Sequence, residues 1–175
     1  MDQIKFTVSH SGVVCGSIVD SLRECPDPEL IYPCICDNSL NSQFNGILCK
    51  GSVLNDTKYQ IVFKQKSSNY TNFVEYFTLK QTKVIHLNSI SNYIFSYIDI
   101  RDNDLLEQID SKIFDKMVDK LFEIRITNNK NYRNVTKFGD LHNTTLFNLS
   151  NNAIEELKYE TFSLNTSGKV IKSLR

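Results

Sequence analysis

Cysteines are the residues of this chain whose spacing says most about chemistry. Cys25, Cys34, Cys36 and Cys49 lie close together, and the fifth, Cys15, lies apart. A zinc site needs two pairs with short internal gaps, and these gaps fit that pattern poorly. Because alternate residues of an extended chain point to opposite faces, Cys34 and Cys36 should have different partners. We expect two disulfides that stabilise a small segment, with unpaired buried thiols as the alternative.

The histidines do not form a recognisable catalytic set. His10, His86 and His142 lie outside any H-E-x-x-H motif, and the sequence contains no nucleophile elbow or phosphate-binding loop. Cys15 would need a neighbouring base to act as a nucleophile, and nothing near it suggests one. We therefore expect a protein that is not an enzyme and that uses no metal and no cofactor.

Charge and hydropathy limit the classes of function that this chain can have. The 175 residues contain 20 Lys+Arg and 20 Asp+Glu, so the formal net charge is zero, which argues against nucleic acid as a partner. No apolar run approaches the roughly 18 residues that span a bilayer, so we expect no transmembrane segment. Residues 1–24 lack the apolar core of a signal peptide, because Lys5, Ser9 and Asp20 interrupt it. This feature conflicts with secretion and favours an intracellular protein.

A recurring motif in the second half of the chain must position any binding residues. Its clearest copy covers residues 144–162, where Phe147 and Leu149 alternate on a short predicted strand. Asn152 follows, and its amide can bond free backbone groups where the chain bends into the core. One such unit cannot bury its apolar face alone, so we expect several units to stack.

Three further copies precede this one. The four frames start near residues 74, 95, 121 and 144, at offsets of 21, 26 and 23 residues. These offsets lie within the roughly 20–29-residue period of leucine-rich repeats. Asn103 and Asn129 stand at the position of Asn152, and Thr82 stands there in the first frame. Chance agreement with a loose template is the alternative, and it is strongest for the frame at 74.

The cysteine spacing and the repeats together resemble extracellular leucine-rich-repeat proteins with an N-terminal cysteine cap. Phe and Ile in place of many Leu resemble secreted arthropod members, which include the non-catalytic subunit of shrimp luciferase. The resemblance implies the pairs Cys25–Cys36 and Cys34–Cys49. It also implies an α/β solenoid, with a short array of about four degenerate repeats, a disulfide cap and parallel strands on the concave face.

The expected organisation divides the chain into five parts. Residues 1–24 are poorly defined, 25–50 form the cysteine-rich cap, 51–73 a linking strand region, 74–162 the repeats and 163–175 a tail. Because an open last repeat exposes an apolar face, we expect either a truncated chain or a tail that folds over that end.

Side chains between the inward strand positions should form a binding surface on the concave face. The residues that we expect there are Tyr76, Thr78, Tyr97, Asp99, Arg101, Glu123, Arg125 and Asn148. Stacked strands should place Thr78, Asp99, Arg125 and Asn148 in one row. An ordinary solvated face is the alternative for any single residue.

Six N-x-[ST] triplets favour a secreted glycoprotein. We expect glycans at Asn55, Asn69, Asn134, Asn143 and Asn165, and not at Asn148, which lies on a predicted strand. The function that follows is recognition of protein ligands outside the cell. The alternatives are an accessory subunit of a secreted enzyme complex and an intracellular repeat adaptor.

Overall fold

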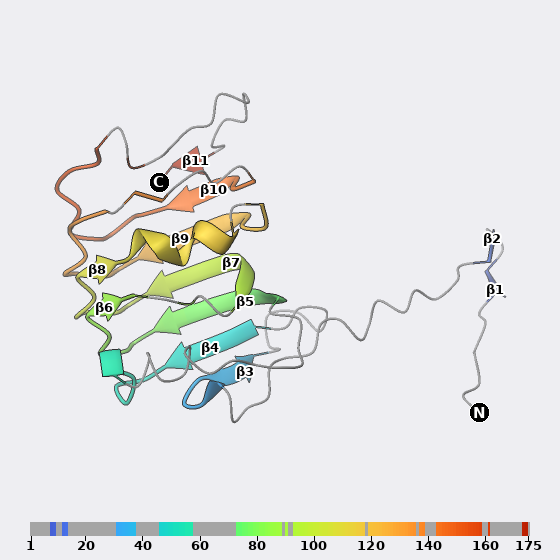
Figure 1. Cartoon of the computed structure of the whole chain (residues 1–175), viewed down its shortest axis with the longest axis horizontal. Coiled ribbons are helices and arrows are strands. Elements are labelled where there is room, and N and C mark those ends of the chain that lie inside the picture. The colour runs from blue at the N-terminus through green and yellow to red at the C-terminus, as the bar shows by residue number, and fades with distance from the viewer. Residues whose placement is uncertain are drawn as a thin grey trace.

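A seven-stranded sheet forms the body of the molecule (Figure 1). The computed structural model describes residues 8–9, 12–13, 31–37, 46–57, 73–88, 90, 93–117, 119–135, 137–138, 143–158, 161 and 173–174. The strand order is β11-β10-β9-β7-β5-β4-β3. In chain order these strands are β3 Ile35–Asp37, β4 Gly46–Lys50, β5 Phe73–Lys80, β7 Ile94–Arg101, β9 Glu123–Thr127, β10 Leu146–Asn148 and β11 Ser173–Leu174.

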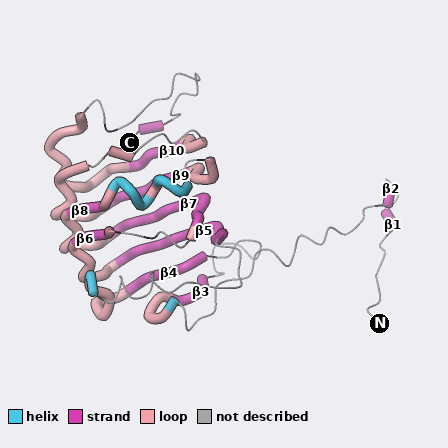
Figure 2. The backbone as a smooth tube through the Cα atoms, in the orientation of Figure 1, coloured by secondary structure: helices cyan, strands magenta, loops and turns pink. Residues whose placement is uncertain are grey.

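Smaller elements accompany this sheet. β6 (His86–Leu87) pairs in parallel with β8 (Gln108–Ile109), and β1 (Val8–Ser9) pairs antiparallel with β2 (Gly12–Val13). Two 3-10 helices, η2 (Ser111–Ile113) and η3 (Asp115–Met117), follow β8. Figure 2 shows these helices crossing one side of the sheet, while β6 and β8 lie at one end of the main strands.

The core lies between the sheet and the segments that cross it. In β7, Phe95, Ile98 and Ile100 are buried, whereas alternate residues toward the end of the strand are half-exposed. This alternation directs one side of the strand into the core and the other toward solvent. A row of aromatic rings adds to the core, with Phe138 in contact with both Phe114 and Phe147. Burial of each such side chain contributes about 1.5–3 kcal/mol.

A left-handed residue follows each of the four strands β5, β7, β9 and β10, directly after the first three and three residues after β10. These residues are Gln81, Asp102, Asn128 and Asn151, with φ between 55° and 59°. Asn and Asp adopt this conformation more readily than other non-glycine residues, because their short side chains bond locally. The chain therefore bends after each of these strands, and the next residue turns inward.

A ladder of amide side chains joins these bends. The Asn103 Oδ1 atom accepts from the backbone N of Thr82 at 3.0 Å, and Asn129 Oδ1 accepts from the backbone N of Asn103 at 3.0 Å. Asn152 Oδ1 likewise accepts from the backbone N of Asn129 at 2.9 Å. Each amide Nδ2 donates to carbonyls of strand residues, as from Asn103 to Leu79 at 3.0 Å. The ladder satisfies backbone groups that the bends would otherwise leave unpaired.

The expected fold class, an α/β solenoid with a leucine-rich-repeat array and parallel strands, is wrong. The regular elements of the described residues are strands and two three-residue 3-10 helices, with single helical turns at Ile31 and at residues 56–57. The sheet is mixed, because β3 and β4 are antiparallel while the other neighbours are parallel. The connections contain an inward bend, the short strands β6 and β8, and turns. Between β8 and β9 the chain forms the 3-10 helices η2 and η3, where the expected fold has an α-helix.

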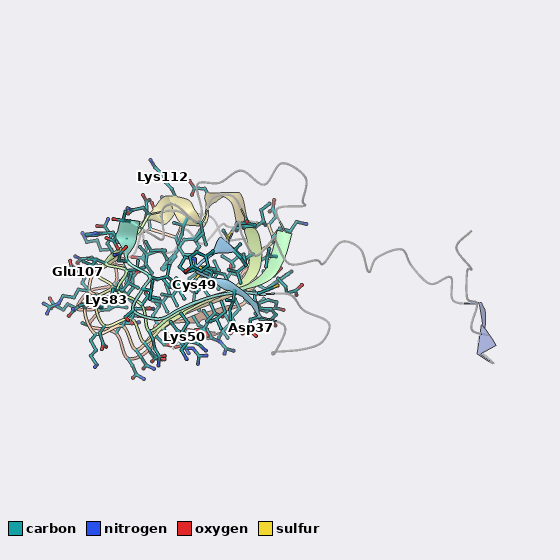
Figure 3. The ribbon with its side chains drawn as sticks, turned by 90° about the horizontal axis from the view of Figure 1, so that it is seen from below. Asp37, Cys49, Lys50, Lys83, Glu107 and Lys112 are labelled. Atoms are coloured by element: carbon teal, nitrogen blue, oxygen red, sulfur yellow. A yellow bond between two sulfur atoms is a disulfide. The ribbon has the colours of Figure 1, made fainter. Side chains whose placement is uncertain are left out.

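One expected disulfide is present in the structure. Cys34 and Cys49 form a disulfide 15 residues apart in sequence, and both are buried. It joins the turn before β3 to β4, and Figure 3 shows Cys49 inside the molecule. Cys36 is also disulfide-bonded, but its expected partner Cys25 and the leftover Cys15 lie outside the described residues. None of the helices in the described part is long and apolar enough to cross a membrane.

Candidate functional site

The side of the sheet that faces away from the core carries polar and aromatic side chains. We call it the polar sheet face, and its residues are Tyr76, Thr78, Lys80, Tyr97, Asp99, Arg101, Glu123 and Arg125. They come from β5, β7 and β9, where they alternate with buried residues such as Phe77 and Ile124. Figure 3 shows Lys50, from the neighbouring strand β4, on the opposite side of the molecule from Lys112 of η2.

Strand register arranges this face in rows that run across the sheet. Thr78 pairs with Asp99, Asp99 with Arg125, and Arg125 with Asn148. These four residues are the row that the frame offsets predict. Such cross-strand neighbours have side chains close enough to interact. The partners that each side chain meets are therefore set by the strand pairing.

A stacked pair of tyrosines forms the aromatic part of the face. The Tyr76 and Tyr97 rings lie 4.5 Å apart between centroids, at 13° to each other. Phe122, just before β9, lies 6.3 Å from Tyr97. On the β4 side, a Cβ added at Gly46 would meet the Tyr76 Cβ at 3.1 Å and the Asp37 carbonyl oxygen at 3.2 Å. Glycine at this position lets β4 approach the two residues closely.

Charged side chains surround the tyrosines. Arg101 Nε lies 3.1 Å from Asp99 Oδ2, and Arg125 Nε contacts Glu123 Oε1. Each pair lies two residues apart on one strand, and therefore on the same face. At the end of the face, Lys80 pairs in register with Arg101. The face thus carries both signs of charge beside an aromatic surface.

A hollow of about 480 Å³ lies on this face. Its lining is the polar sheet face together with Asp37 from β3 and Ile98. Three acidic and three basic side chains line it, so its formal charge is zero. A volume of this size accommodates a few side chains or a small molecule.

Two buried polar atoms belong to residues that line the hollow and lack a hydrogen-bond partner among the described residues. The Asp99 Oδ1 and Arg101 Nε atoms are buried, and neither has a hydrogen bond within the described part of the chain. Arg101 Nε is close enough to Asp99 Oδ2 for attraction, but its N–H does not point at that oxygen in hydrogen-bond geometry. Burial raises the pKa of Asp99 above its ordinary value, and the nearby basic side chains partly oppose this rise.

The pKa of Tyr76 is also raised. Burial is the largest cause, and the neighbouring Tyr97, Glu75 and Glu123 add to it, whereas Arg125 opposes it. The phenol therefore stays protonated at physiological pH, where it can donate or accept a hydrogen bond. Chemically, the face offers hydrogen bonds, charge and aromatic contact. Among the described residues, no group of three or more His, Cys, Asp or Glu side chains is placed to hold a metal ion.

The structure brings seven of the eight predicted surface residues together in the hollow; the eighth, Asn148, lies beside it. Asn148 continues the row next to Arg125, and its Oδ1 accepts from the backbone N of Ser150 at 3.1 Å. Sequence reasoning missed three lining residues, Lys80, Asp37 and Ile98. Lys80 follows Thr78 by two residues, so the same alternation identifies it. Asp37 lines the hollow because β3 pairs antiparallel with β4, and the repeat motif does not include β3.

The predicted glycosylation sites lie in connecting segments where the structure describes them. Asn55 and Asn134 are exposed and form isolated bridges with Lys83 and Glu156. Asn143 is half-exposed, and its Nδ2 donates to the backbone O of Asp119 at 2.7 Å. Asn69 and Asn165 lie outside the described residues.

Comparison with known proteins finds no matching family model, no similar curated protein and no similar solved structure.

Proposed function

We propose that this protein is a non-catalytic recognition protein that binds a protein ligand on the polar sheet face. The observation that carries the proposal is the hollow, to which three neighbouring strands contribute aromatic and charged side chains in register. Tyr and Arg are the residues that most often dominate binding energy at protein interfaces. The stacked pair Tyr76 and Tyr97, with Arg101 and Arg125 beside it, has this composition.

The rigidity of the face supports the same proposal. Its residues lie on strands whose ends are fixed by the ladder of Thr82, Asn103, Asn129 and Asn152. The backbone of such strands loses little further freedom on binding, which reduces the entropic cost of association. Resemblance to extracellular leucine-rich-repeat proteins, secretion and glycosylation are also part of the proposal, and they rest on the sequence motifs.

A paired cross-linking and affinity experiment tests this function. A photoreactive amino acid replaces Tyr97 in one sample and Lys112 in another, and cross-linked proteins are identified by mass spectrometry. A partner that cross-links from position 97 and not from 112 is purified, and its Kd is measured against the full chain. A stoichiometric catalytic partner would favour the accessory-subunit role over free ligand recognition.

The matched variants are Tyr97→Ala with Arg125→Ala on the face and Lys112→Ala with Asp115→Ala on η2 and η3. Lys112 and Asp115 are exposed. We expect the face variant to weaken binding about 30-fold or more, since loss of an interface hot spot costs about 2 kcal/mol or more. The η2 and η3 variant should bind as the original chain does. Equal effects of the two variants would contradict the proposal.

A further inference from the structure

Three basic side chains lie in register at the carboxyl ends of neighbouring parallel strands. Lys50, Lys80 and Arg101 are the last residues of β4, β5 and β7. Lys50 pairs with Lys80, and Lys80 pairs with Arg101. Residues paired in this way project from the same side of a sheet, so the three cations stand side by side on the side of the polar sheet face. We call them the basic row.

Acidic side chains balance only part of the charge of the basic row. Arg101 Nε lies 3.1 Å from Asp99 Oδ2. Asp102 accepts from Asn128 Nδ2 at 3.1 Å, toward β9 and away from the two lysines. Among the described residues, neither lysine of the row forms an ion pair. Like charges that face each other across strands lower the stability of a sheet, so the row retains a positive charge at a cost to the fold.

The basic row is accessible to a ligand. Lys50 is exposed, Lys80 is half-exposed, and 44% of the Arg101 side-chain surface is exposed. Arg101 Nε is buried, so the rest of the side chain provides this exposed surface. Lys80 and Arg101 line the hollow, and Lys50 extends the row beyond it. A ligand that occupies the hollow therefore meets the row at its rim.

We propose that the basic row binds an acidic segment of the protein partner, which sets two or more Asp or Glu carboxylates against Lys50, Lys80 and Arg101. This inference rests on the proposed function and names the chemistry of the partner at one end of the polar sheet face. Carboxylates accept charge-assisted hydrogen bonds from ammonium and guanidinium groups. Such a segment supplies the negative charges that the row lacks within the described part of the chain.

The distribution of charge along the strands supports this orientation of the partner. At the other end of the face, Tyr76 and Tyr97 lie in a register row that also contains Asp37 and Glu123. An acidic segment is therefore attracted to the basic row and not to the tyrosine row. Three cations in a chain of zero net charge suit a few carboxylates better than a polyanion such as a sulfated glycan, which needs an extended basic surface.

Capped four-residue peptides of glutamate, glutamine or lysine test this selection with the full chain. Binding is measured as a Kd by NMR titration at low ionic strength, with the backbone amides of the basic row as the local signal. We expect tetra-glutamate to bind at least about tenfold more tightly than tetra-glutamine or tetra-lysine. A trisulfated heparin disaccharide, which has the same net charge as tetra-glutamate, should bind no more tightly than that peptide.

Two charge-matched variants test whether the basic row is the site. Lys50→Gln with Lys80→Gln removes two positive charges from the row, and Lys112→Gln with Lys120→Gln removes two from exposed positions outside it. We expect the row variant to weaken tetra-glutamate binding at least about tenfold, and the control variant to weaken it at most about twofold. Far-UV circular dichroism establishes that each variant is folded. Because Lys50 is exposed, Lys50→Gln alone provides a milder variant with the same expected direction.

Four outcomes would overturn the acidic-segment assignment. They are no detectable binding of tetra-glutamate, equal binding of another peptide, tighter binding of the heparin disaccharide, and equal effects of the row and control variants. None of these results changes the test of protein binding with Tyr97 and Lys112. A partner that cross-links from position 97 but binds the row variant unchanged would leave the proposed function standing without its acidic segment. Failure of the two proposals is therefore distinguishable.

Discussion

Replacement of Asn103 by alanine should remove more stability than any exposed change near it. This side chain is fully buried, and its Oδ1 accepts from the backbone N of Thr82 at 3.0 Å and from the Thr82 hydroxyl at 2.8 Å. Its Nδ2 donates to the carbonyl oxygens of Leu79 and Arg101, each at 3.0 Å. Alanine can make none of these bonds, so one backbone N–H, one hydroxyl and two carbonyls lose a partner.

The magnitude follows from that count. Each buried polar group left without a partner costs about 1–3 kcal/mol, which gives a range of about 4–12 kcal/mol for four groups. Relaxation of the bend and entry of water offset part of this cost, so we expect the free energy of unfolding to fall by about 4 kcal/mol. Since small proteins unfold with about 5–15 kcal/mol in total, the Asn103→Ala variant should be close to its stability limit.

Two comparisons make the Asn103 result specific. Asn152, at the end of the ladder, is only half-buried, and water can replace its bonds to the carbonyls of Ile126 and Leu149. We therefore expect Asn152→Ala to cost about 1–2 kcal/mol. Asp104 follows Asn103 directly, but its ion pair with Lys130 is exposed. Asp104→Ala should change the free energy of unfolding by less than about 0.5 kcal/mol.

Urea unfolding followed by circular dichroism measures all three variants. The slope m should stay constant while the midpoint falls, which identifies a change in stability instead of a change in the unfolded state. The reasoning would be refuted if Asn103→Ala cost less than about 1 kcal/mol, or no more than Asn152→Ala. Either result would mean that the ladder does not hold the strand ends.

Three further changes test other parts of the structure. The Tyr132 hydroxyl is buried without a hydrogen bond among the described residues, so Tyr132→Phe should leave the unfolding midpoint unchanged or raise it. A decrease of more than about 1 kcal/mol in the free energy of unfolding would show that the hydroxyl has a hydrogen-bond partner. Gly46→Ala should lower the melting temperature by several degrees, because the added Cβ would lie 3.1 Å from the Cβ of Tyr76. An unchanged melting temperature would show that β4 can shift freely. Burial raises the pKa of Asp99 in the folded state, so its carboxylate opposes folding at neutral pH, and this effect fades as the pH falls through the raised pKa. The free energy of unfolding of the original chain, relative to that of Asp99→Asn, should therefore increase on acidification. A decrease would contradict this reasoning.

Local sequence patterns were sufficient for the positions that repeat along the chain. The alternation of apolar residues predicts Phe147 and Leu149 inside, and both are buried. Asn152 is predicted to bond backbone groups at its bend, and it donates to the carbonyls of Ile126 and Leu149. These features follow from the two-residue strand period and from short-range hydrogen bonding, both of which are local.

The remaining features depend on contacts between distant segments. The expected α-helical layer was taken from a family resemblance, and no periodic pattern in residues 102–122 supports it; 3-10 turns stand there instead. The antiparallel pairing of β3 with β4 brings Asp37 to the hollow, and no repeat offset includes it. The unpartnered atoms of Asp99 and Arg101 depend on side-chain direction, which sequence spacing does not determine.

The parallel pairing of β5, β7, β9 and β10 also sets a length scale for whatever lies on the polar sheet face. Neighbouring strands are about 4.8 Å apart, so the row of Thr78, Asp99, Arg125 and Asn148 repeats at that interval over three steps. An α-helix laid along the row has a pitch of about 5.4 Å. Its turns therefore fall out of step with the strands by about 0.6 Å per strand, or by about 2 Å over the whole row. An extended segment, whose same-side residues are about 6.7 Å apart, departs by about 2 Å at the first step. Of these two regular backbones, a helix therefore matches the row over more strands than an extended segment does.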